Sequence, residues 1–327
     1  IYSIALSGKN KKALATEEGT NEATFSPDFS LFINEYSSAQ KPNFYTLNDS
    51  KTGKVVKEIL NNKELEQRVS QYHIGKKEFF ELTTKNGNKL NAWMIKPANF
   101  DENKKYPLFM CQYSGPGSQQ VSNTWSGFDT FWYHMLAQKG YIILCVDGRG
   151  TGYKGADFKK CTYKQLGKYE LEDQIEAATI VGNYKYIDKD RIGIWGWSFG
   201  GFMASNCILR GEVFKMSIAV APVTNWRFYD TVYTERYMQT PQENPEGYDN
   251  NSPLTYAKNL NKKFLLVHGT ADDNVHVQNS MRLIESLVQY NKTFDWAIYP
   301  DKNHGIYGGN TRRHLYEKLT NFVLNNL

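Results

Sequence analysis

Residues 191–201 decide the fold; they read Arg-Ile-Gly-Ile-Trp-Gly-Trp-Ser-Phe-Gly-Gly. The apolar beginning of this stretch predicts a short buried strand, and Phe199–Arg210 predicts the helix that follows. Gly196-Trp197-Ser198-Phe199-Gly200 fits the G-x-S-x-G turn, in which a serine stands on a strained strand-to-helix bend. Glycines are expected beside it because a Cβ there would strike the serine or the sheet. The bend lifts the Ser198 hydroxyl to the helix N-terminus, whose partial positive charge favours an oxyanion.

Strands and helices alternate on both sides of this turn. Short apolar runs predict strands at Tyr106–Tyr113, Gly140–Val146, Ser217–Val220, Phe264–Val267 and Asp295–Tyr299, after a hairpin of Phe79–Thr83 and Leu90–Lys96. Amphipathic patterns predict helices at Phe131–Gln138, Glu170–Tyr184, Met281–Tyr290 and Arg313–Asn325. This alternation predicts an α/β-hydrolase fold, a mostly parallel sheet with helices on both faces.

Residues 1–61 have a different pattern. Turns rich in Ser, Asn, Asp and Gly separate five short runs, which predict an antiparallel meander: Ile1–Leu6, Lys12–Thr16, Leu31–Tyr36, Asn43–Leu47 and Lys54–Ile59. Such a meander makes about one β-propeller blade, and a blade needs neighbours to bury its faces. We therefore expect further blades before Ile1; the alternative is an accessory meander packed on the main domain. The polar segment Asn62–His73 has a helical pattern and is the expected linker. The catalytic domain is expected to comprise residues 62–327, beginning with this linker.

Composition and charge exclude several classes of function. The net charge of +5 is spread over scattered lysine pairs such as Lys76-Lys77, so no nucleic-acid partner is expected. No apolar run approaches the length of a membrane span. The glycine-rich loop at 147–152 lacks the G-x-G-x-x-G order, which argues against nucleotide binding. The chain begins at Ile1 without a methionine, so we expect a processed form or a fragment whose targeting information is missing.

The cysteines and most of the histidines give no sign of a cofactor. The four cysteines have no metal-ligand or redox spacing, and three lie in apolar runs as expected buried hydrophobes: Cys111, Cys145 and Cys207. His73, His134 and His314 fall in helical patterns. His268 and His276 flank an acidic loop and are expected to stabilise it. A metal site of His268, Asp272, Asp273 and His276 is the alternative, although its spacing matches no familiar ligand set. No metal or cofactor is expected.

Groups able to activate Ser198 follow in the order that this fold requires, an acid and then a histidine. Asp272 and Asp273 follow one predicted strand, and His304 follows the next. The carboxyl ends of parallel strands meet at one edge of a sheet, so these groups should converge there. Spacing alone does not decide between the two aspartates. For the oxyanion, we expect the Phe199 backbone N–H as one donor and the Tyr113 phenol, after its strand, as the other.

Four motifs together resemble the prolyl oligopeptidase clan of serine peptidases, and within it the dipeptidyl peptidase IV branch. They are Gly-Trp-Ser-Phe-Gly-Gly (196–201), Asp-Gly-Arg-Gly-Thr-Gly-Tyr (147–153), Val-Tyr-Thr-Glu-Arg-Tyr-Met (232–238) and His-Gly-Thr-Ala-Asp-Asp-Asn-Val-His (268–276). The resemblance covers residues 62–327, and residues 1–61 resemble the end of that family's propeller. It implies that Ser198 is the nucleophile, His304 the base and Asp272 its orienting acid, with Tyr113 and Phe199 as oxyanion donors.

The resemblance also implies a substrate class. Asn274 would bind a substrate carbonyl, and a proline pocket would be lined by Val223, Trp226, Tyr229, Tyr233 and Val275. For these aromatic residues, plain core packing is the alternative. The implied activity is release of N-terminal X-Pro or X-Ala dipeptides through an acyl-enzyme. The alternatives are a related tripeptidyl or acylaminoacyl peptidase, an ester or lipid hydrolase, or a catalytically silent binding relative.

One part of the family's pattern is missing from this sequence. The family binds the substrate's amino terminus with paired glutamates and an arginine in its propeller, and nothing in residues 1–61 replaces them. Dipeptide release therefore follows from the resemblance and not from residues present here. The resemblance further implies a homodimer and a periplasmic, cell-surface or secreted location.

Overall fold

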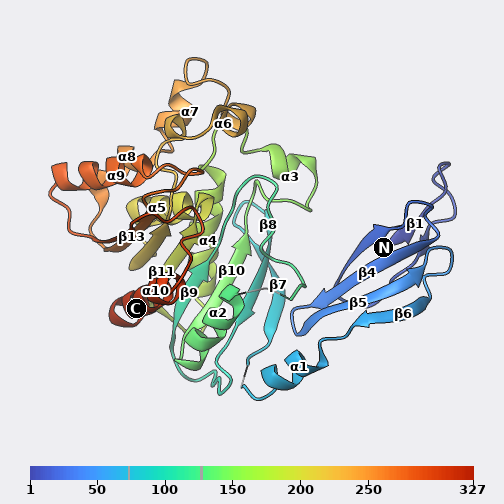
Figure 1. Ribbon diagram of the computed structural model, residues 1–327. Coiled ribbons are helices and arrows are strands. Elements are labelled where there is room, and N and C mark those ends of the chain that lie inside the picture. Colours follow the sequence, from blue (N-terminus) through green and yellow to red (C-terminus); the bar gives the residue numbers. More distant parts are fainter. Residues whose placement is uncertain (73, 126–127) are drawn as a thin grey trace. The chain divides into compact units, whose positions relative to one another are not determined.

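The computed structural model describes residues 1–72, 74–125 and 128–327 (Figure 1). Residue contacts divide the chain into two compact units, which are described separately. The first comprises Ile1–Lys77, Ile95–Ala98 and Ser122–Gln138, and the second comprises Glu78–Met94, Asn99–Val121 and Lys139–Leu327. The expected boundary between Asn61 and Asn62 stays a prediction. In the described residues, no helix combines the length and the apolar character that crossing a membrane requires.

An eight-stranded sheet forms the centre of the second unit, in the order β14-β13-β12-β11-β9-β10-β8-β7. Its strands are β7 (Lys77–Thr83), β8 (Lys89–Ile95), β9 (Tyr106–Cys111), β10 (Ile142–Asp147), β11 (Ile187–Trp197), β12 (Met216–Val220), β13 (Lys263–Gly269) and β14 (Asp295–Tyr299). All five pairings among the six strands β9 to β14 are parallel, which confirms the predicted mostly parallel sheet. Every residue of β9, β10 and β12 is buried, as expected of strands covered on both faces.

Helices lie on both faces of this sheet. They are α3 (Ala156–Lys160), α4 (Tyr169–Gly182), α5 (Phe199–Arg210), α6 (Thr231–Met238), α7 (Pro245–Asp249), α8 (Pro253–Tyr256), α9 (Gln278–Gln289) and α10 (Thr311–Asn326). A Cβ on Gly182 of α4 would lie 3.0 Å from Ile192 Cδ1, whereas a Cβ on Gly193 would lie 3.0 Å from Leu327, after α10. Neighbouring strand residues point to opposite faces, so α4 and the end of α10 cover different faces.

Short helices between β12 and β13 were not predicted from the sequence. They escape periodicity analysis because each is at most eight residues long. Side-chain caps define them instead: Asp230 accepts from the Tyr233 N–H at the start of α6, and Asn244 and Ser252 do the same for α7 and α8. Capping by local polar side chains thus replaces a long apolar stripe as the stabilising feature.

The first unit contains a four-stranded antiparallel meander of β3 (Thr20–Phe25), β4 (Leu31–Ser38), β5 (Lys41–Asp49) and β6 (Val55–Leu60). The predicted strands at 1–6 and 12–16 are only a two-residue pair, β1 (Tyr2–Ser3) and β2 (Lys12–Ala13), in a separate sheet. The polar β3 was missed, because ladder pairing with β4 and not hydrophobicity specifies it. Helices α1 (Lys63–Val69) and α2 (Phe128–Gln138) complete this unit. The assignment to a propeller blade stays a prediction, and His73 lies outside the described residues.

Candidate active site

Ser198 lies on the strained turn that the sequence predicts. Its backbone has φ 61° and ψ −118°, in the positive-φ region that a serine rarely adopts, and it precedes the first residue of α5. A Cβ on Gly196 would collide with the backbone of Gly200, and a Cβ on Gly200 would lie 2.6 Å from the Gln112 carbonyl oxygen. Both glycines are therefore required for the close approach of strand, turn and helix. The Ser198 N–H donates to the Val220 carbonyl at 2.8 Å, which fixes the turn to β12.

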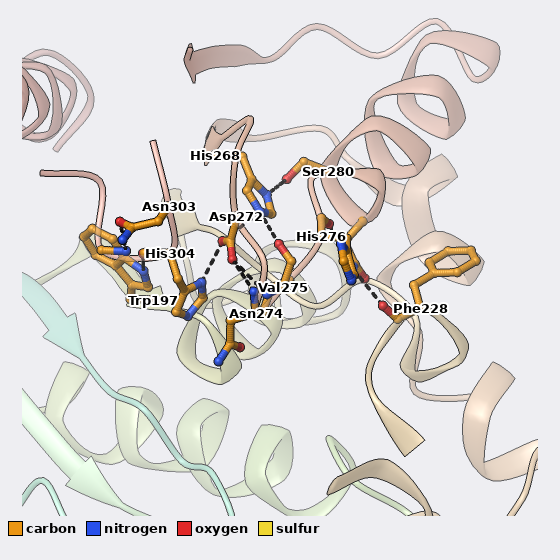
Figure 2. A network of polar contacts seen from close by, with 12 residues as sticks. Trp197, Phe228, His268, Asp272, Asn274, Val275, His276, Ser280, Asn303 and His304 are labelled. Atoms are coloured by element: carbon orange, nitrogen blue, oxygen red, sulfur yellow. Dashed lines mark hydrogen bonds and ion pairs between the residues drawn. The ribbon is translucent and has the colours of Figure 1, made fainter. Parts of the chain in front are cut away.

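Asp272 and His304 meet at the carboxyl edge of the sheet (Figure 2). Asp272 follows β13 and His304 follows β14, and His304 Nδ1 lies 2.7 Å from Asp272 Oδ2. Asp272 is 4 % exposed, whereas its neighbour Asp273 is exposed to solvent. Of the two aspartates that spacing left open, Asp272 is therefore the one that contacts His304.

The remaining contacts of Asp272 keep its carboxylate charged. Its Oδ1 accepts the backbone N–H groups of Asn274 at 3.0 Å and Val275 at 2.9 Å, and its Oδ2 lies 3.2 Å from His268 Nε2. Burial acts to raise the pKa of Asp272, but hydrogen bonds from His268 and His304 hold that pKa well below its usual value. An ionised Asp272 requires a proton on His304 Nδ1, so Nε2 is the ring nitrogen left to act as a base.

A hydrogen bond to the backbone of His304 holds its loop next to the nucleophile turn. Trp197 Nε1, one residue before Ser198, donates to the His304 carbonyl oxygen at 2.9 Å. The His304 side chain is 25 % exposed, so it faces a solvent-accessible region. In the described part of the chain, no hydrogen bond joins the Ser198 hydroxyl to His304. Such bonds often tighten only in the substrate complex.

Tyr113 faces Ser198 from the loop after β9, the strand next to β11. Burial raises the pKa of its phenol, and the nearby Ser198 side chain opposes that rise. Its ring centroid lies 6.0 Å from that of Phe199. Phe199 is the first residue of α5, where a backbone N–H has no acceptor within the helix. A phenol O–H and a backbone N–H without an acceptor in the helix therefore both lie near the serine.

Aromatic rings pack together next to this site. Trp226 lies 5.4 Å from Phe199, 5.8 Å from Tyr229 and 6.0 Å from Tyr233, measured between ring centroids. Trp226, Val223 and Val275 are buried, while Tyr229 and Tyr233 are half-buried. Burial raises the pKa of Tyr229 to about 12, so its phenol stays protonated and donates to Asn274 Oδ1 at 2.9 Å. The Asn274 amide N–H₂ is left to face outward as a donor.

The metal alternative has no support in the geometry. His268 is fully buried, with Nδ1 2.6 Å from Ser280 Oγ and Nε2 2.7 Å from the Val275 carbonyl oxygen. Both ring nitrogens are therefore engaged in the stabilising role that was expected of this histidine. Across residues 1–72, 74–125 and 128–327, no cluster of three or more His, Cys, Asp or Glu side chains is arranged to hold a metal ion.

The sequence did not indicate the residues that connect these groups. Hydrogen bonds beside the site come from Trp197, which occupies only a variable position of the G-x-S-x-G motif. Others come from Gln112, Ser114 and Gln174, which no motif or spacing distinguishes from core residues. The three cysteines expected as buried hydrophobes are indeed buried, and His314 Nδ1 lies 2.9 Å from the Tyr299 hydroxyl.

Comparison with known proteins places the chain in a family. The model of the Prolyl oligopeptidase family matches residues 127–327. A probable dipeptidyl-aminopeptidase B of Phaeosphaeria nodorum is 40 % identical over 331 residues, covering 99 % of this chain and 36 % of the relative. The corresponding protein of Podospora anserina is likewise 40 % identical, with the same coverage. The chain thus spans about a third of the length of the curated relatives it matches.

Solved structures give the same result. The crystal structure of Porphyromonas gingivalis dipeptidyl peptidase 4 matches with a TM-score of 0.97 and 50 % identity, over 100 % of this chain and 46 % of that one. A putative dipeptidyl aminopeptidase IV from Bacteroides ovatus matches with a TM-score of 0.91 and 32 % identity, over the same shares. The chain belongs to the prolyl oligopeptidase family of serine peptidases.

Proposed function

We propose that the protein containing this chain is a serine exopeptidase that releases N-terminal X-Pro or X-Ala dipeptides. The observation that carries the proposal is the contact between the buried Asp272 carboxylate and His304 Nδ1. The hydrogen bond from Trp197 to the His304 carbonyl holds the loop of His304 beside Ser198. The names of the relatives support the dipeptidyl specificity.

The proposed reaction proceeds through an acyl-enzyme. His304 Nε2 accepts the Ser198 proton as Oγ attacks the scissile carbonyl, and the charged Asp272 stabilises the imidazolium. The Tyr113 phenol and the Phe199 N–H donate to the oxyanion. The imidazolium then protonates the leaving amine, and a water molecule, deprotonated by the same nitrogen, hydrolyses the ester.

The aromatic cluster is the proposed pocket for the proline ring. Trp226, Tyr229 and Tyr233 offer flat apolar surfaces, with Val223 and Val275 behind them. Burying a proline ring against such surfaces contributes about 1–3 kcal/mol. The free N–H₂ of Asn274 would bind a substrate carbonyl, since its Oδ1 already accepts from Tyr229.

The test compares X-Pro chromogenic substrates with a free and with a blocked amino terminus, using the full-length protein. The proposal predicts turnover of the free substrate and little turnover of the blocked one. Equal turnover would defeat the exopeptidase assignment, and preference for X-X-Pro or N-acyl substrates would indicate a tripeptidyl or acylaminoacyl peptidase. A silent relative would turn over none of them and would not react with a fluorophosphonate.

We also propose a homodimer and a periplasmic, cell-surface or secreted location. The location rests on the resemblance alone, and fractionation of the producing cells tests it. For the dimer, support comes from exposed apolar side chains: Trp296 of edge strand β14 is 54 % exposed, and Val288 of α9 is 58 % exposed. Sedimentation of the full-length protein should give a dimer that Trp296→Glu weakens, while a wild-type monomer would refute it.

A further inference from the structure

Three buried polar side chains form a hydrogen-bonded set that includes both chain neighbours of Tyr113, and none belongs to the expected catalytic set. Gln112 and Ser114 are its neighbours in the chain and are 6 % and 1 % exposed, and Gln174 of α4 is fully buried. Gln174 Nε2 donates to Ser114 Oγ at 3.3 Å, and Ser114 Oγ donates to Gln112 Oε1 at 3.0 Å. The single hydroxyl proton of Ser114 is thus directed toward Gln112, and the bonds form one continuous chain.

The chain of hydrogen bonds ends on the turn that carries Ser198. Gln112 Nε2 donates to the Gly200 carbonyl at 2.8 Å and approaches the Trp195 carbonyl at 3.4 Å. These carbonyls lie on either side of Ser198 in the sequence, one in β11 and one in the first turn of α5. The amide of Gln112 therefore ties the residue before Tyr113 to both sides of the nucleophile turn.

At its other end, this chain of hydrogen bonds is fixed to the sheet through Gln174. Gln174 Nε2 also donates to the Val146 carbonyl at 2.9 Å, at the end of β10. The opposite amide assignment would place an oxygen against the Val146 carbonyl oxygen, so the orientation of Gln174 follows from its partners. One amide group thereby joins α4, β10 and the loop after β9.

Two features show that this arrangement is not the most stable way to fill the space. Gln174 Oε1 is buried and has no hydrogen-bond partner in the described part of the chain, which costs free energy that a leucine would not. Ser114 has φ 66°, a conformation that a residue other than glycine adopts only when its surroundings hold it there. Ser114, the strained residue, follows Tyr113 in the chain, and the unsatisfied amide of Gln174 is bonded to Ser114, so both features lie where a precise geometry would be useful.

We propose that Gln112, Ser114 and Gln174 are positioning residues that hold the Tyr113 phenol over Ser198. The inference rests on the proposed function, because it requires that Tyr113 donates to the oxyanion. That bond matters only as charge develops in the transition state, so a displaced phenol lowers kcat and leaves KM nearly unchanged. No substitution in this set should lower kcat by more than removal of the phenol hydroxyl itself does.

A double-mutant cycle in the full-length protein tests the inference. Gln174→Met, Tyr113→Phe and the double variant are assayed with an X-Pro chromogenic substrate, with active sites counted by fluorophosphonate titration. We expect Gln174→Met to lower kcat by about 10-fold in the wild-type background. In the Tyr113→Phe background the same change should lower kcat by less than about twofold, because the phenol is already gone.

The matched control is Asn206→Leu in α5. Asn206 is also a fully buried amide, but its Nδ2 donates to the Phe202 and Asn251 carbonyls at 3.2 and 3.1 Å, away from Tyr113. This variant should change kcat by the same factor in both backgrounds. Ser114→Ala, which removes one hydroxyl, repeats the cycle if Gln174→Met does not fold.

The outcomes separate the two levels of the account. Equal losses from Gln174→Met in both backgrounds, or no loss in either, would overturn the positioning role while leaving the peptidase assignment intact. A rise in KM with unchanged kcat would overturn it as well. A wild-type protein that neither turns over the substrate nor reacts with the fluorophosphonate would refute the proposed function, and the inference with it.

Discussion

The two sides of the candidate active site are held in place in different ways. On the acid–base side, two loops after β13 and β14 meet through one buried carboxylate, Asp272, which also binds two backbone N–H groups. On the oxyanion side, Tyr113 lies in the loop after β9, the strand next to β11, and several buried side chains share the task of fixing it. A single substitution should therefore disable the first side, whereas the second should lose activity in steps.

The largest effect is expected from Asp272→Asn. The amide cannot hold the proton on His304 Nδ1, so kcat should fall by about 10⁴-fold in the X-Pro assay. Asp273→Asn is the matched control and should change kcat by less than about twofold, since Asp273 is exposed. Comparable losses in both variants would show that the acid–base side does not depend on one carboxylate.

Removal of the phenol hydroxyl should have the next largest effect. Tyr113→Phe leaves the Phe199 N–H as the remaining oxyanion donor, so kcat should fall by about 10²–10³-fold with little change in KM. Steady-state kinetics with the same substrate measure both constants. A variant with wild-type kcat would exclude the phenol from the oxyanion site.

A smaller effect is expected from His268→Asn, which tests the support behind Asp272. The buried imidazole is one of the groups that keep the pKa of Asp272 low, and one hydrogen bond to a charged group corresponds to about 10-fold in kcat. His276→Asn, at an exposed position, is the control and should retain wild-type kcat. Equal kcat values for the His268→Asn and His276→Asn variants would show that Asp272 does not need its contact with His268.

The last effect leaves kcat unchanged and concerns stability and its dependence on pH. Burial raises the pKa of Glu170 in α4 to about 8, against the opposing effect of the Gly167 N–H bond. Glu170 ionises at a lower pH in the unfolded chain than in the folded protein. The wild-type protein therefore loses stability as pH rises from the usual glutamate pKa toward 8. Glu170→Gln removes this loss.

The temperature at which half of the peptidase activity is lost on heating measures this difference. Between pH 5 and pH 8, the stability of Glu170→Gln relative to the wild-type protein should rise by a few kcal/mol at most. Glu172→Gln, a half-exposed neighbour, should show no such gain. An identical difference in stability between Glu170→Gln and wild type at both pH values would contradict a buried neutral acid at Glu170.

The sequence predicted the parts of this molecule that have a period or a motif. Apolar runs identified the parallel strands, and the G-x-S-x-G turn placed Ser198 on the bend where the structure has it. Strand β3 and helices α6 to α8 escaped, because ladder pairing and side-chain caps specify them. The hydrogen bonds from Gln112 to Gly200 and from Gln174 to Ser114 join residues 88 and 60 positions apart, and single-sequence patterns do not reveal such contacts.

The most direct test of the account is where a fluorophosphonate reacts. The full-length protein is labelled, digested and mapped by mass spectrometry, beside the Ser198→Ala and His304→Ala variants. The account predicts one labelled residue, Ser198, with no label in the first variant and much slower labelling in the second. Labelling of a different residue, or undiminished labelling when His304 is removed, would contradict it.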